Sequence, residues 1–187
     1  MNLYIALLRG INVSGQKLIK MVDLKQMFEQ MGFGKVQTYI QSGNVLFESE
    51  ESEAALRLKI EQRIEEVFGF VVTVVIRTIE QLEHIAKHCP FVANPSSQIE
   101  KVYIALLSEK PSEDKIAKLL LCTSEIDEFQ LSSSKLEVYI LCRQSVRKSI
   151  FTNNFLEKKL GVAATTRNWQ TMSKLTMLGK ALVEEGL

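Results

Sequence analysis

The pentapeptide YIALL stands at residues 4–8 and again at residues 103–107 of the 187-residue chain. Both copies are apolar at odd and even positions alike, which is typical of a strand that is buried on both faces of a sheet. The two copies start 99 residues apart, close to half the length of the chain. The repeat therefore predicts that the elements around the first copy recur around the second.

The first half reads as strand, helix, strand, strand, helix, strand. The glycine-rich loop GINVSGQK follows the first strand, and apolar residues then recur at helical spacing from Met21 to Met31. Ser42 and Gly43 separate two strand-like segments, as in a tight hairpin. A second helix is expected from about Ser52 to Gly69, and VVTVVIR supplies the fourth strand.

The second half repeats this order from KVYIALLSE, with a hairpin around residues 132–135 and a closing strand, VAATT. Helices expected at 79–88 and at about 168–185 are read as additions to the repeat. We therefore predict an α+β protein with two ferredoxin-like βαββαβ lobes from an internal duplication. Residues 1–97 would form the first lobe with a linking helix, and residues 98–187 the second lobe with a C-terminal helix.

Composition excludes several classes of partner. The formal net charge is +1, from 23 basic and 22 acidic residues, so an anion site would have to be local. The longest strongly apolar stretch, 68–76, is far shorter than the ~20 residues that cross a bilayer, and we expect no membrane association. Cys89, Cys122 and Cys142 are scattered, which favours a reducing, cytoplasmic location.

Polar residues follow the first and second strands of the first lobe. These strands run parallel in a ferredoxin-like fold, so their ends share one edge of the sheet. The candidate binding residues there are Arg9, Asn12, Gln41, Ser42 and Asn44, with Ser14 and Lys17 nearby. A guanidinium, amides and glycine-rich backbone suit an anion. In the alternative reading, Arg9 pairs with a carboxylate of the protein, and Asn12 and Asn44 hold turns.

A further polar cluster, TTRNW, opens the C-terminal helix. Thr166 or Asn168 would cap the helix, and Arg167 lies near its amide-rich start. Trp169 is the only tryptophan of the chain and is read as a packing anchor or a stacking platform. Arg167, Asn168 and Trp169 are therefore added to the candidate ligand-binding residues.

The segments ALLRGINVSGQ, TYIQSGNVLF and TTRNWQTMSKL resemble the hallmark segments of a bacterial family, domain of unknown function 1697. The resemblance covers nearly the whole chain and implies paired ferredoxin-like lobes, without an established reaction, substrate or cofactor. The matching signature positions are Arg9, Gly10, Asn12, Gly15, Gln41, Ser42, Gly43, Asn44, Arg167, Asn168 and Trp169. The chain departs from the family pattern at Ser14, at Gln170 and at Ser149-Ile150, where the family usually has Ser-Lys.

Motifs of the familiar nucleotide-binding, zinc-protease and redox classes are absent from the sequence. His84 and His88 lie four residues apart on a predicted helix and Cys89 follows, but we read them as an ordinary helical pair and predict no metal and no cofactor. Two main functions remain. One is a binding module for a small anionic ligand or a nucleic-acid phosphate. The other is an enzyme acting on a small phosphorylated or carboxylated metabolite, for which no general base is evident. A structural partner protein is a third possibility.

Overall fold

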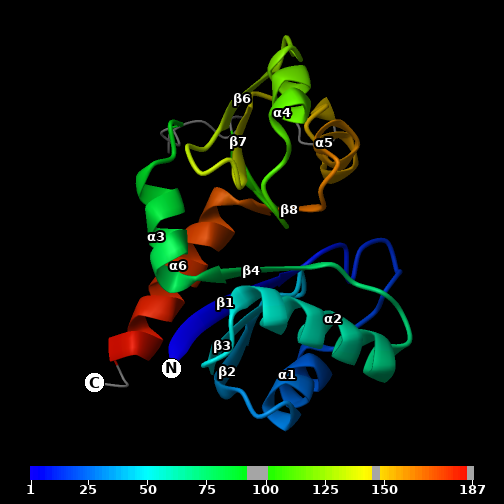
Figure 1. Ribbon diagram of the computed structural model, residues 1–187, viewed down its shortest axis with the longest axis vertical. Coiled ribbons are helices and arrows are strands. Elements are labelled where there is room, and N and C mark those ends of the chain that lie inside the picture. Colours follow the sequence, from blue (N-terminus) through cyan, green and yellow to red (C-terminus); the bar gives the residue numbers. More distant parts are fainter. Residues whose placement is uncertain (92–100, 145–147, 185–187) are drawn as a thin grey trace. The chain divides into compact units, whose positions relative to one another are not determined.

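The computed structural model describes residues 1–91, 101–144 and 148–184, which divide into two compact units (Figure 1). Residues 1–83 and the segment that starts at Leu175 form the first unit, and residues 84–174 form the second. The predicted lobe boundary between residues 97 and 98 lies outside the described residues, so it stays a prediction. No helix in the described part of the chain combines the length and hydrophobicity that a membrane span requires.

The first repeat contains four strands and three helices. They are β1 (Asn2–Leu8), α1 (Met21–Gln30), β2 (Gly34–Tyr39), β3 (Asn44–Ser49), α2 (Glu53–Phe68), β4 (Val74–Thr78) and α3 (Ile79–Lys87). The strands form an antiparallel sheet in the order β2-β3-β1-β4. Because β1 and β2 both pair antiparallel with β3, they run parallel to each other, as the predicted ferredoxin-like topology requires.

The second repeat has the same elements in the same order. They are β5 (Lys101–Leu107), α4 (Glu113–Leu120), β6 (Asp127–Leu131), β7 (Glu137–Cys142), α5 (Asn153–Leu160), β8 (Ala164–Asn168) and α6 (Trp169–Glu184). The sheet order, β6-β7-β5-β8, matches that of the first repeat. The two YIALL segments lie in β1 and β5, the equivalent inner strands. The prediction of two duplicated ferredoxin-like lobes is confirmed.

The structure extends the repeat by one helix, because α3 and α6 occupy equivalent positions. Each follows the fourth strand of its repeat directly and starts with a side-chain cap. Thr78 Oγ1 accepts from Gln81 N at 3.2 Å, and Asn168 Oδ1 accepts from Thr171 N at 2.8 Å. Of the two caps predicted for the last helix, Asn168 is therefore the one observed. The helices α3 and α6, which the sequence suggested were additions, are part of the repeated unit.

Local signals place the second helix of each repeat in the same way. Ser52 caps α2 and Thr152 caps α5, each accepting a hydrogen bond from the amide three residues later. Gly69 and Gly161 end these helices in the left-handed conformation, which glycine adopts without a steric penalty. The helix bounds thus follow from capping residues that the sequence shows directly.

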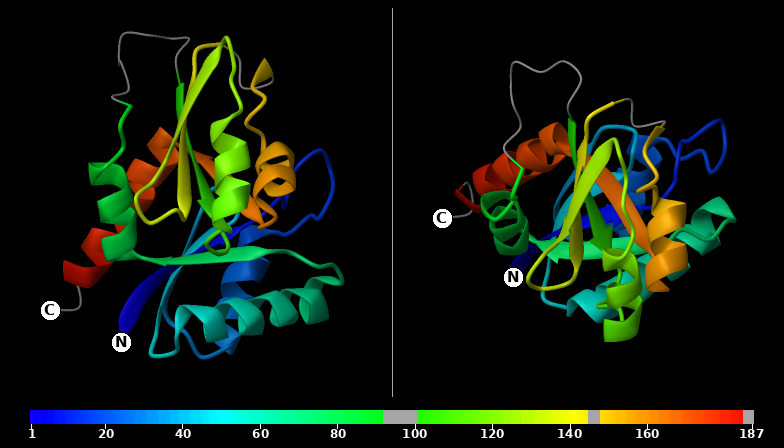
Figure 2. Two further views of the ribbon diagram at one scale, coloured as in Figure 1. Left: turned by 45° about the horizontal axis from the view of Figure 1, so that its top comes forward. Right: turned by 90° about the horizontal axis from the view of Figure 1, so that it is seen from above.

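The core of the first unit lies between its sheet and the helices α1 and α2, which cover one face of that sheet (Figures 1 and 2). Phe28 of α1 and Phe47 of β3 meet edge to face there, with ring centroids 5.3 Å apart. The second unit packs α4 and α5 on its own sheet in the same way. Ile5 and Leu7, which alternate with the helix-facing residues of β1, are also fully buried, so both faces of the inner strand are covered as predicted.

Candidate functional site

The end of the first sheet where β1 and β2 finish and β4 begins is here called the first rim; it consists of the connecting segments 9–20, 40–43 and 69–73. Leu8 N donates to Gly43 O at 2.8 Å, and Arg9 N donates to Thr73 O at 2.9 Å. The three segments therefore lie side by side, as the parallel direction of β1 and β2 predicts. Figure 1 shows the segment after β1, in blue, as a long excursion beyond the end of the strand.

Asn12 fixes the segment 9–20 in place. Its Nδ2 donates to Ile19 O and to Gln41 O, both at 2.9 Å, and its Oδ1 accepts from Ile19 N at 2.8 Å. Its φ of 55° lies in the left-handed region, which asparagine adopts more readily than most residues. The side chain of Asn12 thus clamps one loop to the next, which is the structural role considered for it in the sequence.

Residues 12–17 form a miniature hairpin, here called the finger. Asn12 N donates to Lys17 O at 3.2 Å and Gln16 N donates to Val13 O at 3.0 Å. Ser14 and Gly15, between them, have φ of 50° and 74°, the pair of positive angles that a type I′ turn requires. The sequence predicted only a loop here, although the Ser-Gly dipeptide is a recognised turn signal.

Left-handed backbone is concentrated in the first rim. Of the six non-glycine residues with positive φ in the described ranges, four lie there: Asn12, Ser14, Lys17 and Ile40. Such residues cost roughly 1 kcal/mol or more each and persist where the surrounding structure holds them, often at functional sites. Backbone that alternates between right- and left-handed conformations can also turn successive N–H groups toward one anion.

The hairpin segment 40–43 is held from within by Asn44. This residue is fully buried, and its Nδ2 donates to Tyr39 O at 2.9 Å and to Ser42 Oγ at 3.1 Å. Gln41 is exposed and Ser42 is half-buried, so these two side chains remain closer to solvent. The sequence left open whether Asn12 and Asn44 bind a ligand or hold turns. In the structure, both side chains hold turns.

The charged groups of the first rim are all cationic. Arg9 is half-buried, and Lys17 and Lys20 are exposed. Lys17 Nζ donates to Val71 O at 2.6 Å, which joins the finger to the segment before β4. No aspartate or glutamate occurs in residues 1–22, 35–47 or 67–79. Glu61 reaches the start of β4 from α2, where its Oε1 accepts from Val74 N at 2.8 Å.

The candidate residues of the TTRNW segment belong to the second unit. Arg167 is buried, and its Nη1 donates to Thr165 Oγ1 at 2.8 Å and to Thr166 O at 3.0 Å. Burial lowers the pKa of Arg167 to about 10, so the side chain is still protonated at neutral pH. Arg77 occupies the equivalent position in β4, because Arg77 and Arg167 pair with Ile5 and Ile104 of the two inner strands.

Trp169 begins α6 and is half-buried. Asn168 is exposed, and its Oδ1 accepts the capping hydrogen bond from Thr171 N. The buried position of Arg167 and the capping bond of Asn168 give both residues structural roles in β8 and α6. A ligand-binding role for Arg167, Asn168 and Trp169 stays a prediction.

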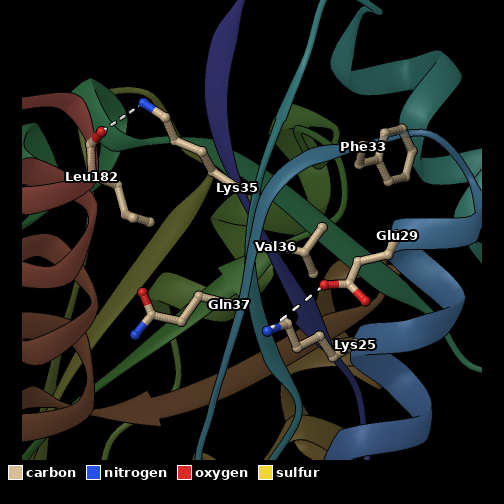
Figure 3. A pocket seen from close by; sticks show the side chains of 7 residues that line it. All are labelled: Lys25, Glu29, Phe33, Lys35, Val36, Gln37 and Leu182. Carbon is tan, nitrogen blue, oxygen red and sulfur yellow. Dashed lines mark hydrogen bonds and ion pairs between the residues drawn. The ribbon is translucent and has the colours of Figure 1, made fainter. Parts of the chain in front are cut away.

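A separate pocket of the first unit lies along the outer edge of β2, between α1 and the C-terminal part of α6 (Figure 3). Its cations have partners within the unit. Lys35 Nζ donates to Leu182 O at 2.9 Å and lies 3.0 Å from Glu48 Oε1, and Lys25 lies 3.7 Å from Glu29. None of the predicted site residues lines this pocket, and it receives no functional assignment.

The histidine and cysteine residues were the other candidates for chemistry. The rings of His84 and His88 stack with centroids 3.9 Å apart, and His88 Nδ1 lies 2.8 Å from His84 O, as expected for neighbours on one helix face. Among the described residues, no three histidine, cysteine or acidic side chains are grouped to hold a metal. Burial raises the pKa of Cys142 to about 11 and also raises the pKa of Cys89, which leaves both thiols poor nucleophiles at neutral pH.

Comparison with known proteins gives a family and a fold. The chain shares 23% sequence identity with a conserved bacterial protein from Streptococcus pneumoniae, with a TM-score of 0.70; the match covers 94% of this chain and 97% of the other. No curated protein is significantly similar to the chain. The model of the family described as "Protein of unknown function (DUF1697)" matches residues 1–137. The chain therefore belongs to this uncharacterised family, as its three signature segments predicted.

Proposed function

We propose that the first rim binds an anionic group, a phosphate or a carboxylate, carried by a small ligand or by a nucleic acid. The observation that carries the proposal is the charge of the rim: Arg9, Lys17 and Lys20 occur in its three connecting segments, which contain no aspartate or glutamate. Exposed cations such as Lys17 and Lys20 raise the local concentration of anions even when the net charge of the protein is near zero.

The backbone adds neutral donors to these charges. The residues with positive φ in the finger change the direction of its backbone N–H groups. The helix α1 starts at Met21, and the side chain of Lys20 forms no capping hydrogen bond with it. Uncapped first-turn amides of a helix favour anions. Asp23, in the first turn of α1, is the first carboxylate after this region and sets the limit of the cationic surface.

Gln41 and Ser42 belong to the proposed site as polar neighbours of the finger, whereas Asn12 and Asn44 shape it. Arg167, Asn168 and Trp169 are an optional part of the proposal, because the first rim has its cations without them. A cytoplasmic location is also proposed, in agreement with the three free cysteines.

The test is the stability of the protein in inorganic phosphate, measured by thermal unfolding against chloride at equal ionic strength. A specific site raises the free energy of unfolding by about 1.4 kcal/mol when phosphate is at ten times its Kd. For a chain of this size this corresponds to roughly 3–6 °C in Tm. We expect Lys20→Gln and Arg9→Gln to reduce the phosphate-dependent shift.

Lys118→Gln is the matched control, because Lys118 is an exposed lysine at the end of α4 in the second unit. This variant should keep the full shift. An equal shift in all four proteins would locate the anion elsewhere and reject the first rim. A ligand that is found by the same assay and recovered chemically intact supports a binding module. Chemical conversion of the ligand would instead show that the protein is an enzyme.

A further inference from the structure

We propose that His84 and His88 together bind one divalent transition-metal ion of the kind that prefers imidazole ligands, such as Zn²⁺, Ni²⁺ or Cu²⁺. Both residues belong to the second unit, whereas the first rim belongs to the first, so the proposal does not depend on the anion site. The sequence favoured an ordinary helical pair at these positions. The arrangement of the two rings is what the structure adds.

The two imidazole rings lie against each other at the end of α3. His88 follows the helix directly, and its backbone N donates to His84 O at 3.1 Å, so the last turn extends through it. The ring centroids are 3.9 Å apart, and the ring planes differ by 28°. Two metal–nitrogen bonds of about 2.0–2.1 Å let the two nitrogens lie up to about 4 Å apart. The separation of the rings therefore suits one shared ion, as for the paired zinc-binding histidines of a helix.

The side-chain hydrogen bond of His88 prepares its other nitrogen for a metal. His88 Nδ1 lies 2.8 Å from His84 O, and a carbonyl oxygen only accepts hydrogen bonds, so Nδ1 carries the hydrogen atom. In the neutral ring, Nε2 then has a free lone pair. Histidines that bind metals commonly donate from their second nitrogen to a backbone carbonyl in this way, which fixes the tautomer and the orientation of the ring.

The surroundings of the pair favour a cation. Both histidines are exposed, so a hydrated ion reaches them without any opening of the fold. They lie at the C-terminal end of a helix, where carbonyl groups without helical partners give a partial negative charge. Lys87, the other basic residue of the last turn, is exposed, and its charge lowers the affinity for the ion.

Two protein ligands make an open site. Among the residues that the structure describes, no third histidine, cysteine or acidic side chain completes a metal-binding group, so water fills the remaining positions. Burial raises the pKa of Cys89, so this neighbouring thiol stays protonated at neutral pH. Closed structural zinc sites use four protein ligands, so a site with two is expected to bind its ion reversibly.

The experiment follows the imidazole proton resonances of the whole chain by NMR while ZnCl₂ is added at neutral pH. The sequence contains only these two histidines, so their signals report on the site directly. We expect both rings to follow one binding curve that saturates at one Zn²⁺ per chain. MgCl₂ should leave both rings unchanged, because Mg²⁺ prefers oxygen ligands.

Substitutions separate a shared site from two independent histidines. His84→Asn, followed at His88, and His88→Asn, followed at His84, should each weaken zinc binding by at least about tenfold, because the second ligand no longer adds to the first. Both positions are exposed, so the variants should fold. Cys89→Ser is the control for the thiol and should bind Zn²⁺ like the parent protein.

Three results would overturn the proposal. The first is zinc binding to each histidine in the parent protein that is as weak as in the single variants. The second is loss of zinc binding in Cys89→Ser, which would make the thiol the ligand. The third is binding of Zn²⁺ with unchanged affinity by His84→Asn/His88→Asn in calorimetry, which would place the ion elsewhere. None of these results bears on phosphate binding at the first rim.

Discussion

The two repeats have the same topology but end in different rims. The second rim, equivalent to the first, consists of residues 108–112, 132–136 and 161–163. Its main hydrogen bonds are conserved in position: Leu107 N donates to Leu136 O, and Ser108 N donates to Ala163 O. The scaffold that brings three connecting segments together is therefore a property of the fold and is present twice.

The segment after the inner strand differs most between the two rims. It has twelve residues between β1 and α1 but five between β5 and α4, so the second rim has no room for a finger. Lys135 is the one non-glycine residue with positive φ among the described residues of the second rim, against four in the first. Most of the left-handed backbone is thus confined to one copy of a shared scaffold.

The charges differ in the same direction. In the second rim, Lys135 Nζ donates to both carboxylate oxygens of Glu113, at 2.7 and 2.8 Å, and Lys110 lies 3.8 Å from the same group. Glu137 occupies the register position of Asn44, and its Oε2 accepts from Ser132 and Ser134. The common fold alone therefore does not create the cationic surface; the first rim differs from the second in having the finger and in lacking carboxylates.

Giving the first rim the charge of the second should have the largest effect. In Asn44→Asp, a fully buried amide that donates to Tyr39 O is replaced by an acceptor, and we expect a loss of about 3 kcal/mol in the free energy of unfolding, together with the loss of phosphate binding. Burial raises the pKa of the introduced carboxyl group, so its neutral form is favoured in the folded protein. The loss should be smaller at pH 4 than at pH 7 in urea unfolding.

Asn154→Asp is the control, because Asn154 is exposed in the first turn of α5, where a negative charge is tolerated. It should unfold like the parent protein at both pH values. A loss for Asn44→Asp that grows toward acid pH would contradict the assignment of Asn44 as a buried donor.

The second prediction concerns Gly43, whose equivalent in the second rim is Leu136. A β-carbon on Gly43 would lie 2.6 Å from Ile11 Cδ1 and 2.9 Å from Leu8 Cβ, and φ is +77°. Gly43→Ala should therefore cost about 2–3 kcal/mol, from crowding and from the left-handed backbone together, measured as a lower urea midpoint.

Gly15→Ala separates these two causes. Gly15 has φ of +74°, but a β-carbon there would have no heavy atom within 4 Å. We expect a loss of about 1 kcal/mol for this variant. Equal losses at both glycines would mean that crowding against Ile11 and Leu8 contributes nothing.

The smallest effect is expected when the second rim is given the charge of the first. Glu109→Gln/Glu113→Gln removes two exposed carboxylates and releases Lys135, whose hydrogen bond and charge lower the pKa of Glu113 in the parent protein. We expect nearly unchanged stability, since surface pairs of this kind contribute little. The same thermal assay would follow phosphate binding at the second rim, in a protein that also carries Lys17→Gln/Lys20→Gln to weaken the first rim. We expect no binding at the second rim, because that rim has no finger. Its appearance would show that charge alone makes the site.

Much of the fold could be predicted because local signals repeat. YIALL marks both inner strands, Ser52 and Gly69 bound α2, and Thr152 and Gly161 bound α5. The meeting of the loops after β1 and β2 also followed from the topology alone. The finger was not predicted, because its Ser-Gly turn is short and lies within a longer glycine-rich loop. The place of Lys20 in the proposed site was not predicted either, because Lys20 precedes a helix and carries no motif.

By itself, the sequence determined the strands, the helices and the duplication, because periodicity, caps and turn residues act over a few neighbours along the chain. The tertiary structure decided which polar residues hold turns and which face solvent. Asn44 and Gln41 are three residues apart with similar side chains, yet the first is fully buried under its own hairpin and the second is exposed. Burial is decided by residues distant in the chain that pack around a side chain, and a single sequence does not specify it locally.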